Sequence, residues 1–210
     1  MTETYLTGIL LAYGAFGLGI LSPGPNILAV IGTSMSTDRK SGMALAFGIA
    51  SGSFLWGLMT LFGLTALIAL YASLMTGIKI AGAAYLLWLA FKAFRSALSA
   101  NAVTVRAVAH QKSSFGYFQR GLLIQMTNPK AALTWIAIMS LAMGADAPFW
   151  VGAVVVAGTS LLSVLGHLGY ALAFSTAPMV AAYGKARRWI DGALGCFFCF
   201  ASYKLITSRT

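Results

Sequence analysis

The chain has 210 residues, of which 59% are hydrophobic and only 9% are charged, and its net charge is +10. A water-soluble domain carries roughly 25% charged residues, so this composition excludes a soluble enzyme and indicates a multi-pass membrane protein. The basic residues lie between apolar segments and form no compact basic domain, so we attribute them to membrane orientation and expect no nucleic-acid partner.

Six apolar segments predict an all-α, polytopic membrane protein with six transmembrane helices, because each segment is near the ~20 residues that cross a bilayer. In chain order the segments cover residues 5–33, 42–70, 78–94, 118–143, 149–174 and 189–206. The first two are long enough for a strong tilt or an internal break. The opening residues MTETY carry an acid rather than a basic run, so we expect no cleavable signal peptide.

The Lys and Arg side chains concentrate on one side of these spans if the spans alternate in direction. Ten of them lie in or beside the connections after the first, third and fifth spans: Arg39, Lys40, Lys92, Arg95, Arg106, Lys112, Arg120, Lys185, Arg187 and Arg188. Three lie on the other side: Lys79, Lys204 and Arg209. Because cytoplasmic loops carry the excess of basic residues, the sequence predicts three cytoplasmic basic loops and both termini outside the cytoplasm.

The first span is interrupted near its middle by the motif LSPGPN, residues 21–26. Pro23 and Pro25 have no backbone N–H, and each clashes with the preceding helical turn, so with Gly24 they should unwind several residues. Freed backbone groups are unfavourable in lipid by several kcal/mol each unless protein or water satisfies them. We therefore expect this stretch to face a hydrated cavity inside the helix bundle.

A second interrupted stretch resembles the first. GLGILSPGPNIL (17–28) aligns with GLLIQMTNPKAAL (121–133), and a proline follows the first glycine by eight residues in both, Pro25 in one and Pro129 in the other. The second proline lies among polar residues, Thr127, Asn128 and Lys130. The sequence therefore predicts two broken helices at corresponding places.

The polar segment 96–114 is predicted to be a cytoplasmic linker between a first three-helix repeat, 1–95, and a second, 115–210. Because three spans are an odd number, the second repeat would be inverted relative to the first. Weakly similar halves with Pro/Gly-interrupted spans are typical of secondary transporters. We expect alternating access, in which the two halves rock around the paired breaks.

The paired breaks suit a zwitterionic ligand such as an amino acid, since half-helix N-termini attract carboxylates and half-helix C-termini attract cations. Lys130 lies within an apolar span and is a candidate for holding a carboxylate; the alternative is that it snorkels to the interface. The residues expected to bind or gate substrate are Ser22, Pro23, Gly24, Pro25, Asn26, Thr127, Asn128, Pro129 and Lys130.

Two side chains are candidates for proton coupling. Asp191 is the only carboxylate within a predicted span, although an interfacial ion pair with Arg187 or Arg188 would also explain it. His167 lies in the fifth span and titrates near neutral pH, although a structural hydrogen bond is the alternative.

The chain resembles the lysine exporter (LysE) superfamily and, within it, the homoserine/threonine exporter (RhtB) branch. The resemblance is carried by SPGPN, STDRKSG (36–42), GIASG, IKIAGAAYLLWLAFKAFRS and FQRGLLIQMTNPKAAL. It implies a six-helix carrier of the bacterial inner membrane that exports amino acids or their derivatives, of homoserine, threonine or lysine type, driven by the proton gradient. It implies no enzyme activity and no cofactor, and it places Pro23, Gly24, Pro25, Asn26, Asn128, Pro129 and Lys130 on family motifs.

Two other functions stay open at this stage. Cys196 and Cys199 have the CxxC spacing of a membrane thiol oxidoreductase, but no adjacent basic group lowers their pKa. A metal-ion exporter of similar architecture would need clustered Asp, Glu or His ligands within its spans, and the sequence offers none.

The small-residue spacing of Gly48 and Gly52 favours close helix packing, within the chain or in a homodimer.

Overall fold

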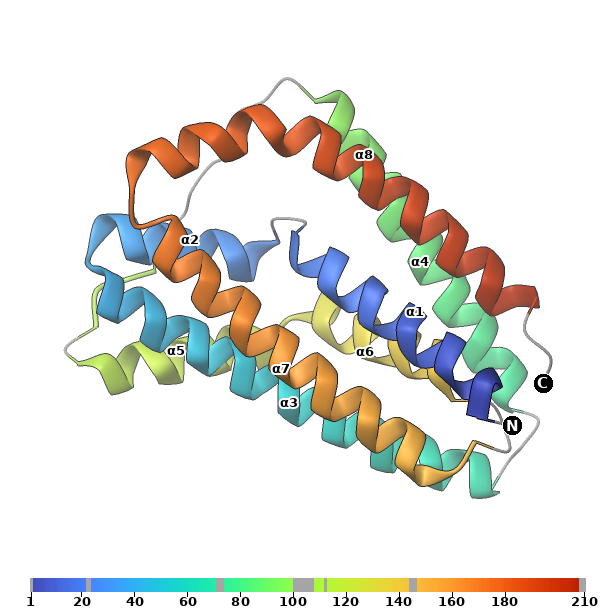
Figure 1. Cartoon of the computed structure of the whole chain (residues 1–210). Helices are drawn as coiled ribbons and strands as arrows, with labels where there is room; N and C mark the ends of the chain where they lie inside the picture. The colour runs from blue at the N-terminus through green and yellow to red at the C-terminus, as the bar shows by residue number, and fades with distance from the viewer. Residues whose placement is uncertain are drawn as a thin grey trace.

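The computed structural model describes residues 2–21, 24–70, 74–99, 108–111, 113–143 and 147–207. These residues form eight α-helices and no strand (Figure 1), which confirms the all-α class. The helices are α1 (Thr2–Leu21), α2 (Pro25–Ser36), α3 (Arg39–Leu70), α4 (Leu74–Leu98), α5 (Ser114–Met126), α6 (Pro129–Ala142), α7 (Phe149–Ala173) and α8 (Ala177–Thr207).

The same order of elements occurs in both halves of the chain: a broken pair of helices and then two long helices. The first predicted span is divided into α1 and α2, and the fourth is divided into α5 and α6. Both divisions fall at the predicted proline motifs. Ser22 and Pro23 of the first motif lie outside the described residues.

By length and composition, three described helices could each cross a membrane: Arg39–Gly63 within α3, Phe149–Ala173 (α7), and Gly184–Thr207 within α8. The pair α1 and α2 would make a fourth span, bent by 43° at the break. α5 and α6 have 13 and 14 residues, which is shorter than the ~20 that a span needs. The structure therefore supports a multi-pass membrane protein, and the arrangement of six spans stays a prediction.

The last helix begins twelve residues before the predicted start of the sixth span. Lys185, Arg187 and Arg188, which were expected in a loop, lie on this helix, so that part of the prediction is wrong. The preceding stretch is rich in Ala, a strong helix former, and Pro178 is the second residue of α8, where a missing N–H breaks no helical bond. The predicted linker began too early and ended too late, because residues 96–98 belong to α4 and Ser114 begins α5. Within it, residues 108–111 are described and are not helical.

Glycines allow α3 and α5 to pack closely, and these helices come from different halves of the chain. A Cβ atom on Gly48 would collide with the carbonyl oxygen of Phe118, and one on Gly121 would collide with the carbonyl oxygen of Leu45. Gly52 faces the side chain of Gln125 in the same interface. The Gly48–Gly52 spacing thus serves packing within the chain, and the homodimer stays a prediction.

The counterpart helices α3 and α7 run antiparallel. Arg39, at the start of α3, donates hydrogen bonds of 3.0 and 3.1 Å to Ser175 Oγ, just beyond the end of α7. In the turn before α3, the backbone N–H of Ser41 bonds Asp38 Oδ1 at 2.8 Å, which lowers the pKa of this carboxyl group.

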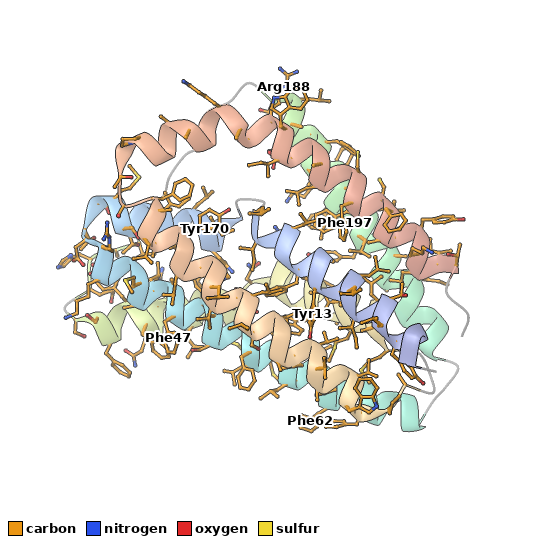
Figure 2. All side chains as sticks on the ribbon, in the orientation of Figure 1. Tyr13, Phe47, Phe62, Tyr170, Arg188 and Phe197 are labelled. Atoms are coloured by element: carbon orange, nitrogen blue, oxygen red, sulfur yellow. The ribbon has the colours of Figure 1, made fainter. Side chains whose placement is uncertain are left out.

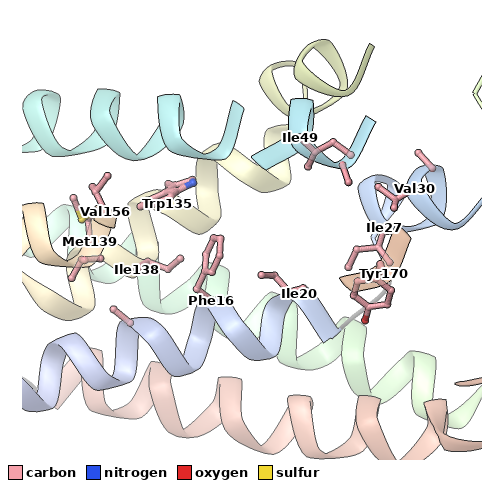
Figure 3. Packing of buried hydrophobic residues seen from close by; sticks show 14 of the residues in the cluster. Phe16, Ile20, Ile27, Val30, Ile49, Trp135, Ile138, Met139, Val156 and Tyr170 are labelled. Carbon is pink, nitrogen blue, oxygen red and sulfur yellow. The ribbon is translucent and has the colours of Figure 1, made fainter. Parts of the chain in front are cut away.

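α4 and α8 are also antiparallel, because Ser96 bonds Asp191 while Ser202 bonds the carbonyl of Ala83. Their apolar seam forms a second hydrophobic cluster beside the main core. The main core is built on α1, α2, α3, α6 and α7 (Figure 3). On the outer surface, large apolar side chains such as Phe47 and Phe62 are exposed (Figure 2), as suits contact with lipid.

Candidate functional site

The two helix breaks meet in the interior of the molecule. The side-chain amide of Asn26, in the first turn of α2, donates to the side-chain carbonyl of Gln125, at the end of α5. Asn128 Nδ2, at the second break, donates to Asn26 Oδ1 at 3.1 Å. Trp56 of α3 completes the network, because its Nε1 donates to the backbone carbonyl of Gln125 at 3.2 Å. A chain of hydrogen bonds therefore joins residues about 100 positions apart in the sequence.

The second break forms because α5 cannot continue through Pro129. Asn128 adopts an extended conformation as the N-cap of α6, and its Oδ1 accepts from the backbone N–H of Lys130 at 3.0 Å. Pro129 is the first helical residue, where its missing N–H breaks no helical bond. Asn128 thus uses its oxygen to cap its own helix and its amide to reach the other break.

The first break is built differently. Gly24 is the extended N-cap of α2, Pro25 follows at the first helical position, and no side chain caps the helix. The first intrahelical bond runs from Leu28 N to the carbonyl of Gly24. The backbone N–H groups of Asn26 and Ile27 therefore have no partner within α2, and they add to the partial positive charge of the helix N-terminus.

Lys130 connects the second break to the first electrostatically. Its Nζ lies 3.4 Å from the position that a Cβ on Gly24 would occupy. The side chain is partly buried, and no described residue gives its ammonium group a hydrogen bond or an ion pair. An ammonium group at membrane depth is unfavourable, and water or an anionic group in the cavity would stabilise it.

A cavity of about 90 Å³ lies between the two breaks and is lined by residues from all eight helices. Its polar side chains are Asn26, Ser53, Gln125, Asn128, Lys130, Thr134 and His167. The other lining residues are apolar, including Phe16, Ile20 and Ile138, which Figure 3 shows side by side. The space suits several waters. It is smaller than the roughly 300 Å³ at the low end of small-molecule sites, so a solute larger than a few waters would require helix movement.

His167 lines this cavity and is buried in α7. Its Nδ1 lies 2.8 Å from the carbonyl oxygen of Ser163 and 3.3 Å from Ser163 Oγ. A carbonyl oxygen only accepts, so Nδ1 carries a proton. In the neutral ring Nε2 is then an acceptor, and no described residue bonds it.

Asp191 is buried between α4 and α8, outside the cavity lining. Its Oδ2 accepts from Ser96 Oγ at 2.7 Å and lies 3.4 Å from Arg187 Nε, so the predicted ion pair is with Arg187. Its Oδ1 is buried without a hydrogen-bond partner among the described residues. Asp191 precedes the cavity residue Phe198 by seven positions, which places it on the same face of α8, about 10.5 Å away.

The remaining predicted residues take other positions. Gly24 lines the cavity, while Thr127 is exposed and bonds the carbonyl of Leu123 within its own helix. Cys196 and Cys199 are unpaired and exposed on α8, and neither lines the cavity.

Sequence reasoning missed two residues that hold the site together, Gln125 and Tyr85. Tyr85 of α4 donates to the backbone carbonyl of Lys130 at 2.9 Å and lies 3.0 Å from Thr134 Oγ1. The signal for Gln125 was an amide one turn before Asn128 in the otherwise apolar end of α5, residues 121–126. Tyr85 gave no such signal, because tyrosine is common in membrane helices.

Comparison with known proteins agrees with this architecture. The profile of the family described as LysE type translocator matches residues 18–209. The chain belongs to this family. Membrane translocation of a solute is therefore its role, and the resemblance seen in the sequence motifs is confirmed.

Relatives of this translocator come from several bacteria. It is 30% identical to the uncharacterized membrane protein YahN of Escherichia coli K12, over 100% of this chain and 95% of the relative. It is 32% identical to the threonine efflux protein of the same organism, over 91% and 94%. It is 31% identical to the uncharacterized membrane protein YrhP of Bacillus subtilis, over 57% and 60%. No solved structure gives a significant match.

Proposed function

We propose that this translocator exports amino acids with neutral side chains, of the threonine type, across the bacterial plasma membrane. The observation that carries the proposal is the meeting of the two helix breaks, through Asn26 and Asn128, around a cavity lined by Lys130, whose ammonium group has no ion pair with any described residue. The name of the threonine efflux protein, which is 32% identical over 91% of the chain, supports the substrate class.

The substrate carboxylate would bind at the start of α2. The uncapped N-terminus there offers the N–H groups of Asn26 and Ile27, and helix N-termini bind anions for this reason. Lys130 Nζ lies beside Gly24 in the same region and supplies a full positive charge. Together they would form a carboxylate site at the cavity.

The charges around the cavity favour a neutral side chain on the substrate. None of the residues that line the cavity is acidic. Asp191 lies outside the lining and is paired with Arg187, and Asp38 lies in the turn before α3. A lysine or arginine substrate would bring a second positive charge next to Lys130 without a counter-ion, which is strongly unfavourable at membrane depth.

Alternating access with an inverted 3+3 repeat of six spans is part of the proposal, with both termini outside the cytoplasm. The antiparallel direction of α3 relative to α7, and of α4 relative to α8, supports inversion, since each helix and its counterpart run in opposite directions. Figure 1 shows the start of α1 and the end of α8 at one end of the molecule, away from the connection between α2 and α3.

Proton antiport is the proposed energy source, with Asp191 as the coupling carboxylate. Its unpartnered Oδ1 can take up a proton without breaking an existing hydrogen bond. Asp191 lies on the same face of α8 as the cavity residue Phe198, so a change of its charge would act on the side of the helix that faces the cavity.

Vesicles that contain the purified protein test the proposal through efflux of labelled L-threonine under an imposed pH gradient. Lys130→Met should abolish efflux, Lys130→Arg should retain part of it, and Lys40→Met, in the first turn of α3, should match the wild type. Efflux from wild-type vesicles no faster than from empty vesicles would reject L-threonine as a substrate. Full activity of Lys130→Met would reject the carboxylate site.

A further inference from the structure

We infer that His167 is a specificity-determining residue that binds the α-ammonium group of the substrate through Nε2. The inference rests on the proposed function, because it concerns the other half of the same zwitterion. It assigns a substrate contact to a side chain otherwise considered only for proton coupling.

The first argument is the hydrogen bonding of the ring. His167 is 6% exposed and lines the cavity, and its Nδ1–H is held by the carbonyl oxygen of Ser163, one turn earlier on α7. Nε2, on the opposite side of the ring, is therefore an acceptor in the neutral form and has no partner among the described residues. Because His167 lines the cavity, a donor bound in the cavity can give Nε2 the hydrogen bond that the described residues do not supply.

The second argument is the position of the ring next to the carboxylate site. Ile20 of α1 packs against Gly166, the neighbour of His167, since a Cβ on Gly166 would lie only 2.8 Å from Ile20 Cγ2. Ile20 and Gly24 both line the cavity. Ile20 lies just before the first helix break, and Gly24 lies at the break. In an α-amino acid the carboxylate and the ammonium group share one carbon atom, so the two subsites must be neighbours.

The third argument is the backbone of α1, which ends at the same place. The carbonyl of Gly19 would bond the N–H of residue 23 in a continuous helix, but Pro23 has no N–H. Gly19 lines the cavity, and a Cβ placed on it would meet nothing within 4 Å, so no neighbour fills the space beside it. The negative end of α1 and His167 thus both lie at the cavity, where we expect them to bind the ammonium group of the substrate.

The other polar acceptors of the cavity are already engaged. Gln125 and Asn26 accept from the side-chain amides of Asn26 and Asn128, and Ser53 Oγ accepts from Trp135 Nε1 at 3.2 Å. Thr134 Oγ1 lies in the hydrogen bond with Tyr85. Among the described side chains that line the cavity, His167 Nε2 is the acceptor that takes part in none of these hydrogen bonds.

The test compares two ligands on two variants. L-threonine and its des-amino analogue, 3-hydroxybutyrate, are titrated into the purified full-length protein, and affinity is measured by calorimetry. His167→Leu should weaken L-threonine binding about ten- to a hundredfold, the loss expected for one hydrogen bond to a charged group, and change the affinity for the analogue less than twofold. His167→Gln, which keeps an acceptor, should restore most of the affinity for L-threonine.

The outcomes separate this inference from the proposed function. Unchanged binding of L-threonine by His167→Leu, or an equal loss for both ligands, would overturn the role of His167 while the carboxylate site stands. Lys130→Met should weaken both ligands together. If the wild-type protein bound neither ligand, or Lys130→Met changed neither affinity, the proposed function would fail and the inference with it. Continued binding of the analogue by His167→Leu shows that this variant is folded.

Discussion

Asn128 Nδ2 lies 3.1 Å from Asn26 Oδ1, although the two residues are 102 positions apart in the chain. Each asparagine lies at a proline break, and each break occupies the same place in its half of the molecule. The contact joins the start of α2 to the start of α6, so the positive ends of two half-helices face one cavity.

Loss of this contact should impair transport more than stability. Asn128→Ser keeps a side chain that can cap α6 but is too short to reach Asn26. We expect export to fall at least tenfold, because the two breaks are no longer held in register, while the melting temperature in detergent falls by only a few degrees. Ser51→Ala, which removes a hydroxyl that bonds only its own helix, is the control. Export by Asn128→Ser equal to that of the control would show that the hydrogen bond between Asn128 and Asn26 is not needed for transport.

The contact between α3 and α5 should tolerate no side chain at Gly48. Gly48→Ala places a methyl group against the carbonyl of Phe118, and such overpacking is unfavourable by about 1–3 kcal/mol. Gly63→Ala, on the same helix with nothing within 4 Å, should leave stability unchanged or raise it slightly. Thermal unfolding in detergent measures both. Equal melting temperatures would contradict the close packing of α3 on α5.

Replacement of Asp191 by Asn should uncouple transport from protons. The amide keeps an oxygen for Ser96 but cannot take up a proton, so we expect efflux driven by a pH gradient to be lost while exchange of labelled for unlabelled substrate continues. Asp38→Asn, at a carboxyl group outside the cavity, should keep both activities. Gradient-driven efflux by Asp191→Asn at the wild-type rate would remove this carboxylate from coupling.

The double variant Cys196→Ser/Cys199→Ser should export as the wild type does. Both thiols are exposed on α8 and neither lines the cavity, so their removal alters no cavity contact. Efflux from vesicles, with and without a thiol-specific oxidant, measures the effect. Loss of efflux in the double variant would support a mechanism that depends on the two thiols.

The breaks were predictable from the sequence because proline acts locally: it has no N–H and ends a helix wherever it occurs. The partners of the break residues were not predictable. Gln125, Trp56 and Tyr85 reach the breaks only through packing between helices, and the sequence carries no local signal for that. The start of α8 was predicted too late for a different reason. Lys and Arg were assigned to loops by their charge alone, but these side chains also occur on the polar part of a helix.

The repeat in the sequence does not divide the molecule into two bodies. α3 packs most extensively on α5 and α4 on α8, each pair with one helix from either half. Through Tyr85 and Lys130, α4 also holds the first turn of α6. The three-helix repeats are therefore interlaced through these packed pairs. If the cavity opens by movement at the two breaks, where α1 meets α2 and α5 meets α6, the packed pairs would carry helices of both repeats with them.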